Sequence, residues 1–297
     1  MGGNSFKAIG NKVYENYTDG IKIYLESTDD EYIVGRKWFS HLKDKISFES
    51  VSETRADGGC QIVRKKVQDS KASNKKAFGI VDRDILLADP LFRDSLWWEI
   101  DNDVFTSSRP YEDGDIFVLH YWELENYLLH PQALELLLAD KKLTNSPSIS
   151  ASAIADLLVK FEADLIAVTL LSIVPAQSGI KQVADGFELQ TSGDLLLTKV
   201  IEQLEVSDEF AKNERQKIQQ FAENETNSIT RWNKLSRMLD GKRIMYRIER
   251  LLFDNNMVNC KISLASERGV LAGHIANQNL IDPALSNWLN VIYQSAL

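Results

Sequence analysis

Acidic side chains follow three of the stretches that this sequence predicts as β-strands: Glu26 the first, Asp82 and Asp84 a later one, and Glu123 and Glu125 the next. In an open parallel sheet the carboxyl ends of neighbouring strands face one crevice, so residues far apart in the sequence can lie close together. Crowded carboxylates repel unless a cation neutralises them, and oxygen ligands without Cys or His favour Mg²⁺ or Mn²⁺. We therefore predict a metal site at Glu26, Asp82 and Asp84, of the kind that activates water for phosphodiester cleavage.

Each of these residues also has a purely structural interpretation. An Asp-x-Asp pair often decorates an exposed loop, and Asp30 can be a helix N-terminal charge favoured by the helix dipole. Glu123 is interpreted as a first-turn helix charge, so Glu125 is preferred as the additional ligand. Lys242 follows an Asp-Gly pair and is either an ordinary helix-start lysine or a phosphate contact.

Four short apolar stretches, rich in β-branched and aromatic residues, predict the strands that must position these groups. Helix-length segments at residues 30–42 and 60–70 separate the first three of them, which implies right-handed crossovers and a mostly parallel sheet. An Asp-Gly-Gly turn at residues 57–59 precedes the second helix. The fold class expected is α/β. The predicted strands are residues 21–25, 45–51, 76–81 and 115–120.

After Pro131 the pattern becomes helical. We expect a core at residues 1–130, a helical region at 131–240 for partner docking or dimerisation, and a segment at 241–297 that packs back on the core. The strongest boundary signal is the Asn-Ser-Pro-Ser-Ile-Ser stretch at 145–150. Helices are predicted at residues 133–139, 151–171, 195–204 and 209–224.

The net charge and the histidine and cysteine spacing argue against some classes of function. The chain carries 34 Lys and Arg against 43 Asp and Glu, a formal charge of −9, which argues against a protein that coats nucleic acid with a basic surface. The four histidines and two cysteines show no zinc-ligand spacing. A basic run is interpreted as a solvated face, with contact to a nucleic-acid backbone as the alternative. It comprises Arg64, Lys65, Lys66, Lys71, Lys75 and Lys76.

No apolar run is long enough to cross a bilayer, and the first residues show no signal-peptide pattern, so we expect a cytoplasmic protein without a membrane association. No Gly-x-x-x-x-Gly-Lys-Ser/Thr loop is present. The chain should therefore not hydrolyse ATP by a P-loop mechanism, and any nucleotide control must come from a partner.

Four segments together resemble the TOPRIM fold, in the variant seen in overcoming-lysogenization-defect nucleases and, more narrowly, in the effectors of the PARIS anti-phage system that are encoded beside ABC-type ATPases. The likeness covers roughly residues 20 to 130 and, more weakly, the Asp-Gly-Lys segment. The segments are Ile-Tyr-Leu-Glu-Ser-Thr-Asp-Asp at 23–30, Gly-Ile-Val-Asp-Arg-Asp at 79–84, Leu-His-Tyr-Trp-Glu-Leu-Glu-Asn-Tyr-Leu at 119–128 and Asp-Gly-Lys at 240–242.

The resemblance implies roles for the site residues. Glu26 would be the general acid/base or a metal-binding carboxylate, and Asp82 and Asp84 would be metal ligands. Glu125 and Asp30 would complete or support the site, and Lys242 would contact the scissile phosphate. One departure is Ser27, where the family often has glycine; serine tolerates a positive φ less readily, which puts the loop geometry in doubt.

The resemblance also implies a biological role. The protein would be a toxic nuclease that cleaves transfer RNA and arrests translation during phage infection. An ABC-type ATPase would hold it inactive until a phage protein triggers its release, and the freed effector would form a homodimer. Two alternatives remain open: a non-catalytic Mg²⁺-binding regulatory or binding module of α/β fold, and a primase or topoisomerase relative with the same core.

Overall fold

The computed structural model describes residues 20–51, 59–141, 149–178 and 191–295 and divides the chain into two compact units. The first unit comprises the described residues up to Ile80, then Tyr111–Phe117, then those from Pro283 onward. The second comprises Val81–Pro110 and Val118–Asp282. The predicted turn at Asp57 and Gly58, the first 19 residues and most of the boundary at 145–150 lie outside the described residues. The division at 130 and 240 stays a prediction.

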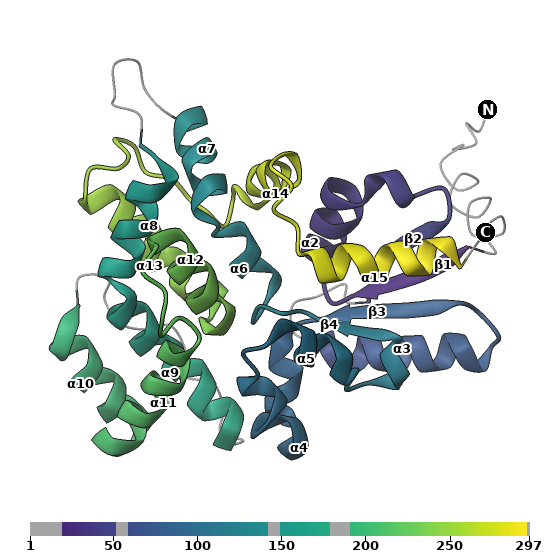
Figure 1. Ribbon diagram of the computed structural model, residues 1–297, viewed down its shortest axis with the longest axis horizontal. Helices are drawn as coiled ribbons and strands as arrows, with labels where there is room; N and C mark the ends of the chain where they lie inside the picture. Colours follow the sequence, from purple (N-terminus) through teal and green to yellow (C-terminus); the bar gives the residue numbers. More distant parts are fainter. Residues whose placement is uncertain (1–19, 52–58, 142–148, 179–190, 296–297) are drawn as a thin grey trace, which may run out of the picture. The chain divides into compact units, whose positions relative to one another are not determined.

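A four-stranded parallel sheet in the order β2-β1-β3-β4 forms the centre of the first unit (Figure 1). Within it, Ile23 of β1 lies beside Phe48 of β2 and Phe78 of β3. The expected α/β class and parallel sheet are confirmed. The strands are β1 (Ile21–Leu25), β2 (Ile46–Ser50), β3 (Ala77–Val81) and β4 (Ile116–Val118).

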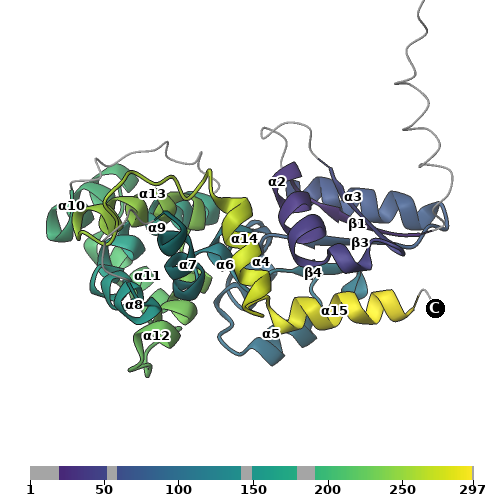
Figure 2. The ribbon, with the colours of Figure 1, turned by 90° about the horizontal axis from the view of Figure 1, so that it is seen from above.

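Helices cover both faces of this sheet (Figure 2). On one face, Trp288 of α15 (Pro283–Gln294) packs against Phe78 and Phe117, with ring centroids 6.0 and 5.4 Å apart. On the other face, α3 (Gly59–Ala72) buries two valines that approach Gly79. Because side chains alternate along a strand, neighbouring residues of β3 contact different helices.

The segment predicted as one helix at 30–42 consists of three shorter pieces: α2 (Thr28–Asp30), the π-helix η2 (Glu31–Trp38) and the 3₁₀-helix η3 (Ser40–Leu42). The N–H of Phe39 bonds to the carbonyl of Val34 at 2.9 Å, which is the wider spacing of a π-helix. The short 3₁₀-helix η6 (Glu112–Gly114) precedes β4.

The second unit consists of helices. Two of them, α8 (Ala151–Lys160) and α9 (Glu162–Ser178), were predicted as one, but the chain breaks at Phe161. Helix α8 packs against α7 and α12, and α9 packs against α10, α11 and α13. The remaining elements are η4 (Arg83–Ala88), α4 (Pro90–Arg93), η5 (Leu96–Trp98), α5 (Asn102–Ser108), α6 (Leu124–Leu128), α7 (Pro131–Lys141), α10 (Gly193–Leu204), α11 (Asp208–Gln220), α12 (Ser228–Leu235), η7 (Ser236–Met238), α13 (Gly241–Asp254) and α14 (Arg268–Asn277).

A buried tryptophan fixes the centre of this helical unit. Trp232 of α12 is completely buried, and its indole N–H donates to the carbonyl of Leu129 at 2.9 Å. Its large apolar surface is therefore buried without an unsatisfied donor. In the part of the chain that the structure describes, no helix combines the length and the apolar character needed to cross a membrane.

Candidate functional site

Glu26 lies directly after β1, in the first unit. The next residue, Ser27, caps α2: its hydroxyl accepts from the backbone N–H of Asp30 at 3.1 Å, and its own N–H donates to the Asp30 carboxylate at 2.9 Å. This reciprocal pair is a capping box. Asp30 therefore has a local structural role. Ser27 has φ −133°, so the position that is often glycine in TOPRIM proteins does not require glycine here.

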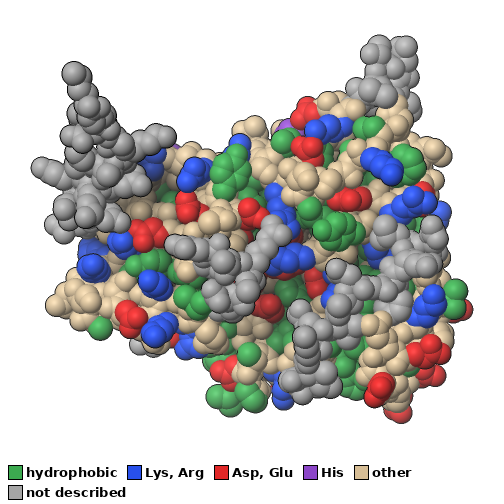
Figure 3. Space-filling view, turned by 180° about the vertical axis from the view of Figure 1, so that it is seen from behind, with side chains coloured by type: hydrophobic (Ala, Val, Ile, Leu, Met, Phe, Trp, Pro, Cys, Tyr) green, Lys and Arg blue, Asp and Glu red, His purple; other side chains and the backbone are tan. Residues whose placement is uncertain are grey.

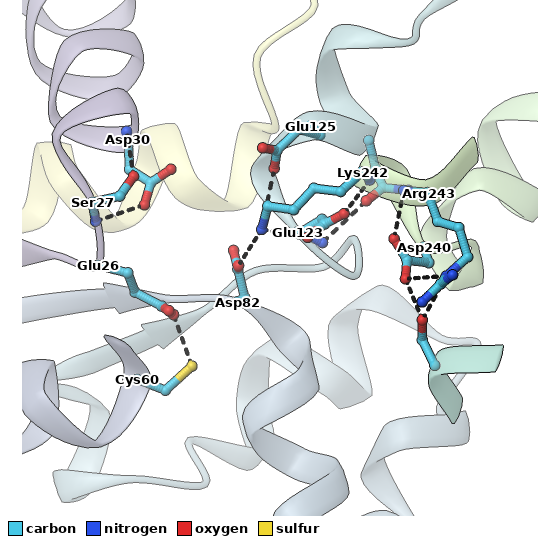
Figure 4. A network of polar contacts seen from close by, with 12 residues as sticks. Glu26, Ser27, Asp30, Cys60, Asp82, Glu123, Glu125, Asp240, Lys242 and Arg243 are labelled. Carbon is cyan, nitrogen blue, oxygen red and sulfur yellow. Dashed lines mark hydrogen bonds and ion pairs between the residues drawn. The ribbon is translucent and has the colours of Figure 1, made fainter. Parts of the chain in front are cut away.

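The start of α3 lies against the Glu26 carboxylate. The thiol of Cys60 donates to Glu26 Oε1 at 2.8 Å (Figure 4). A Cβ placed on Gly59 would lie 2.7 Å from Glu26 Cβ, closer than real Cβ atoms come. Only glycine allows this approach. The contacts at the start of α3 therefore position the Glu26 side chain.

In the second unit, the residue between the two predicted ligands Asp82 and Asp84 is a completely buried arginine. The N–H of Arg83 donates to the carbonyl of Trp122 at 2.8 Å, and its guanidinium lies 4.3 Å from the ring of Phe105. Burial lowers the pKa of Arg83. Arg83 thus fixes the backbone from which both aspartates project. Its guanidinium also donates to the carbonyls of His120 (2.7 Å), Leu96 (3.2 Å), Trp97 (2.7 Å) and Glu99 (3.0 Å).

Helix α13 presents Lys242 to three carboxylates of the same unit (Figure 4). Its Nζ lies 2.6 Å from Glu123 Oε2, 3.7 Å from Glu125 Oε2 and 3.9 Å from Asp82 Oδ2. Arg268 adds a second cation, 2.9 Å from the other oxygen of Glu125. The structure therefore brings together Asp82, Glu125 and Lys242, which come from three of the four segments on which the resemblance rests.

The two segments that carry Glu125 and Lys242 are joined through Asn126. Its amide donates to the carbonyls of Ser236 and Leu239 at 2.7 and 2.8 Å, just before α13 begins. A Cβ on Gly241 would lie 2.6 Å from the Asn126 side-chain oxygen, so glycine is needed at this contact. The Asn of the Glu-Asn-Tyr-Leu segment and the Gly of the Asp-Gly-Lys segment thus position the Lys242 ammonium.

The N-terminus of α13 is also attached to α9. Asp240 caps α13, because its side chain accepts from the N–H of Arg243 at 2.8 Å. The N–H of Asp240 donates to Thr169, and its carboxylate accepts from Ser172, both on α9. These bonds fix the start of α13 and so the direction in which the Lys242 side chain projects from it.

Glu123 also belongs to the cluster of carboxylates around Lys242, although its sequence context predicted only a charge at a helix start. It does cap α6, and its side chain is also buried. Burial raises the pKa of Glu123 to about 8; Lys242 opposes this rise, and Glu125 and Asp240 add to it. Partial burial opposes the charge on Lys242, but Glu123, Glu125 and Asp82 raise its pKa well above the usual value. The sequence signals for Glu123 were its position after the fourth predicted strand and its spacing of two from Glu125.

The carboxylates of the second unit are spaced around an ammonium group. Among the described residues, no three His, Cys, Asp or Glu side chains are grouped closely enough to hold a metal ion as they stand. Glu26 and Asp30 belong to the first unit, and Asp82, Asp84, Glu125 and Lys242 to the second. The predicted convergence of Glu26 with Asp82 and Asp84 would involve both units and stays a prediction.

The predicted basic run is partly occupied by contacts inside the first unit. Arg64 pairs with Glu112 at 2.8 Å, Lys71 pairs with Asp115, and Lys76 donates to the carbonyl of Ser295 at 3.0 Å. On the face shown in Figure 3, basic and acidic side chains are interspersed. This distribution agrees with the formal charge of −9.

In comparisons with known proteins, no protein family, no curated protein and no solved structure matches this chain.

Proposed function

We propose that this chain is a metal-dependent endonuclease with a TOPRIM core. The observation that carries the proposal is the meeting of Asp82, Glu125 and the Lys242 ammonium in one unit. Carboxylates at the end of a parallel strand, next to a cation that can bind a phosphate oxygen, form a set of groups suited to phosphodiester hydrolysis. The donor atoms are all oxygens, which fits Mg²⁺ or Mn²⁺.

Each side chain has a distinct task under this proposal. Asp82, Asp84 and Glu125 would hold the ion, with Glu26 as a further ligand or as general acid/base. The metal would supply an activated water and charge neutralisation at the phosphate. Lys242 would bind a non-bridging phosphate oxygen, and Glu123 would keep the ammonium in position. Cys60, which donates to Glu26, would hold that carboxylate in one rotamer.

The resemblance to TOPRIM effectors, and more narrowly to AriB of the PARIS system, supports a biological role. We propose a cytoplasmic toxin of abortive infection that cleaves transfer RNA. Under this proposal an ABC-type ATPase restrains it until a phage protein triggers release, and the active form is a homodimer. A restraining partner is physically reasonable, because an unrestrained nuclease would damage its own cell.

The experiment is an incubation of the purified protein with total RNA and Mg²⁺ or Mn²⁺, with and without EDTA. We expect discrete RNA bands to disappear only with metal, and Glu26→Ala and Asp82→Asn to abolish this loss while the far-UV circular dichroism stays that of the wild type. The exposed lysine of α11 offers a matched control, Lys212→Met, which should cleave like the wild type. RNA and DNA that stay intact with every metal would refute the nuclease.

One observation favours a second candidate, a non-catalytic Mg²⁺-binding or regulatory module. Glu125 contacts both Lys242 and Arg268, so its charge is already neutralised by protein cations, as in a purely structural ion-pair network. Under this interpretation Glu26→Ala leaves the cellular phenotype unchanged. Toxicity of the wild-type chain in cells, and its loss in Glu26→Ala, distinguishes the two candidates.

A further inference from the structure

Helix α13 extends from the candidate site and carries a row of exposed cationic and aromatic side chains. Lys242, Tyr246, Arg250 and Phe253 follow one another at spacings of four, four and three residues, which places them on one face of an α-helix. At 1.5 Å per residue the row is about 16 Å long. Tyr246 is 56% exposed and Phe253 39% exposed.

The opposite face of α13 accounts for the packing of the helix, so the two rings are not needed for it. Ile244, Met245, Ile248 and Leu252 are buried in the second unit. Tyr246 and Phe253 do not belong to this buried set and expose ring surface to water. Aromatic rings set between cations differ from the contiguous apolar face that would dock another protein helix.

The two cations of this row pair with carboxylates of the same unit. Asp254 pairs with Arg250 at 2.6 Å, and the Arg250 guanidinium lies 6.0 Å from the Phe253 ring. The Glu249 carboxylate accepts from the backbone N–H of Leu264 at 2.5 Å. Lys242 pairs with Glu123 at 2.6 Å, so the row alternates rings with ion-paired cations, and a bound phosphate would share these cations with their carboxylates.

We propose that this face of α13 binds a single-stranded segment of nucleic acid and leads it to Lys242. Exposed rings stack on unpaired bases of any sequence, and Lys242 and Arg250 are complementary to the phosphates between those bases. A paired duplex offers no free base faces to Tyr246 and Phe253, so the segment bound is a loop or an unpaired end. The inference rests on the proposed nuclease function and specifies how its substrate is held.

A cavity at the far end of the same helix provides a place for one base. It has a volume of about 320 Å³ and is lined by Asn255, Asn256 and Met257, which directly follow α13, together with Glu135 and Ser150. The side-chain amides of Asn255 and Asn256 can bond to the donors and acceptors on a base edge, while the Met257 side chain supplies an apolar contact. The Glu135 carboxylate accepts from the N–H of Ala151 at 3.1 Å. The bound strand thus extends from Lys242 along α13 to this cavity.

The test measures binding separately from cleavage. All variants are made in a Glu26→Ala background, and fluorescence anisotropy follows the binding of a labelled, unstructured RNA of roughly 16 nucleotides. We expect Tyr246→Ala and Phe253→Ala each to raise Kd between about fivefold and about a hundredfold. Tyr246→Phe keeps the ring and should bind like the parent. Leu195→Ala, at a residue of α10 that is 60% exposed, is the matched control for losing an exposed apolar side chain.

A second part of the experiment tests the role of positive charge on this face of α13. Asp254→Asn releases Arg250 from its ion pair, so we expect tighter binding and a steeper dependence of log Kd on log salt. An excess of unlabelled duplex RNA of the same length should compete poorly. Equal Kd values for the two ring variants and for Leu195→Ala would overturn the proposal, as would equal competition by duplex. Absence of cleavage by the wild type, with ring-dependent binding retained, would refute the nuclease and leave the binding surface standing.

Discussion

Replacing Lys242 by methionine isolates the electrostatic part of the candidate site. The change keeps the length and apolar stem of the side chain and removes the ammonium that lies 2.6 Å from Glu123 and 3.7 Å from Glu125. Glu123 is only 5% exposed, so it would be left as a buried carboxylate without its cation. Breaking a buried ion pair in this way costs about 3–5 kcal/mol.

Two features reduce this cost. The Lys242 side chain is 56% exposed, so water already screens part of the attraction, and Glu123 can take up a proton when its partner is removed, since burial favours its neutral form. We therefore expect a loss of ~2 kcal/mol in the free energy of unfolding. With a urea m-value of about 2 kcal/mol per molar, the unfolding midpoint falls by about 1 M.

Urea unfolding followed by circular dichroism measures this shift, with Lys212→Met of α11 as the control for removing an exposed lysine. Adding Glu123→Gln to Lys242→Met should recover most of the loss, because no buried charge then lacks a partner. The wild type, Lys242→Met, Glu123→Gln and the double variant form a double-mutant cycle, and we expect a coupling energy of at least about 1 kcal/mol. A Lys242→Met midpoint equal to that of Lys212→Met would refute the reasoning.

Three further predictions concern stability. Burial lowers the pKa of His130 to about 4, below the ~6.5 of an unfolded chain, so the unfolded state binds more protons between these values and stability falls as pH drops. The loss is about 2 kcal/mol at pH 5, and His130→Gln should remove it in urea titrations across pH. Asn126→Ala leaves two buried carbonyls without their donor and should cost about 3 kcal/mol by the same measurement. Gly59→Ala forces the start of α3 away from Glu26 and should cost about 1–3 kcal/mol in thermal unfolding; an unchanged Tm would contradict the close contact.

Local sequence patterns predicted the sheet well. The bounds of β1 agree with the prediction, because residues 21–25 alternate and a charged residue follows them. β4 ends at Val118 although the apolar stretch continues, because its partner β3 ends at Val81, whose carbonyl receives the N–H of Leu119. The end of an edge strand depends on its neighbour, which no local pattern contains.

The errors in the predicted helix bounds also come from contacts that are distant in the sequence. Residues 151–171 contain no glycine or proline, so their apolar periodicity indicated one helix. In the fold, the N–H of Phe161 bonds to carbonyls of the preceding turn and the chain starts a new helix at Glu162. The break separates two helices with different main packing partners, α7 and α12 for α8 and α10, α11 and α13 for α9, and no local pattern contains these contacts.

Of the residues in this cluster, the sequence indicated Asp82, Glu125 and Lys242, but neither the role of Glu123 nor the cation Arg268. Asp82 and Glu125 stand at the ends of recognisable strands or motifs, whereas Arg83 gives no sequence signal that it is buried. The partners of Glu123 and Glu125 lie far along the chain, at Lys242 and Arg268. Only the tertiary fold decides which charges meet.

The charge balance of this group bears on its chemistry. Asp82, Glu123 and Glu125 face two cations, Lys242 and Arg268. Burial raises the pKa of Glu123 to about 8, so the remaining charges balance at pH 7, and one negative charge is in excess only when Glu123 is ionised. A metal ion bound beside these carboxylates would favour the ionised form of Glu123, while the half-exposed ammonium of Lys242 remains accessible to a phosphate. Metal binding is common to the nuclease and to the Mg²⁺-binding module, so the loss of toxicity in Glu26→Ala, and not the charge balance, distinguishes these two candidates.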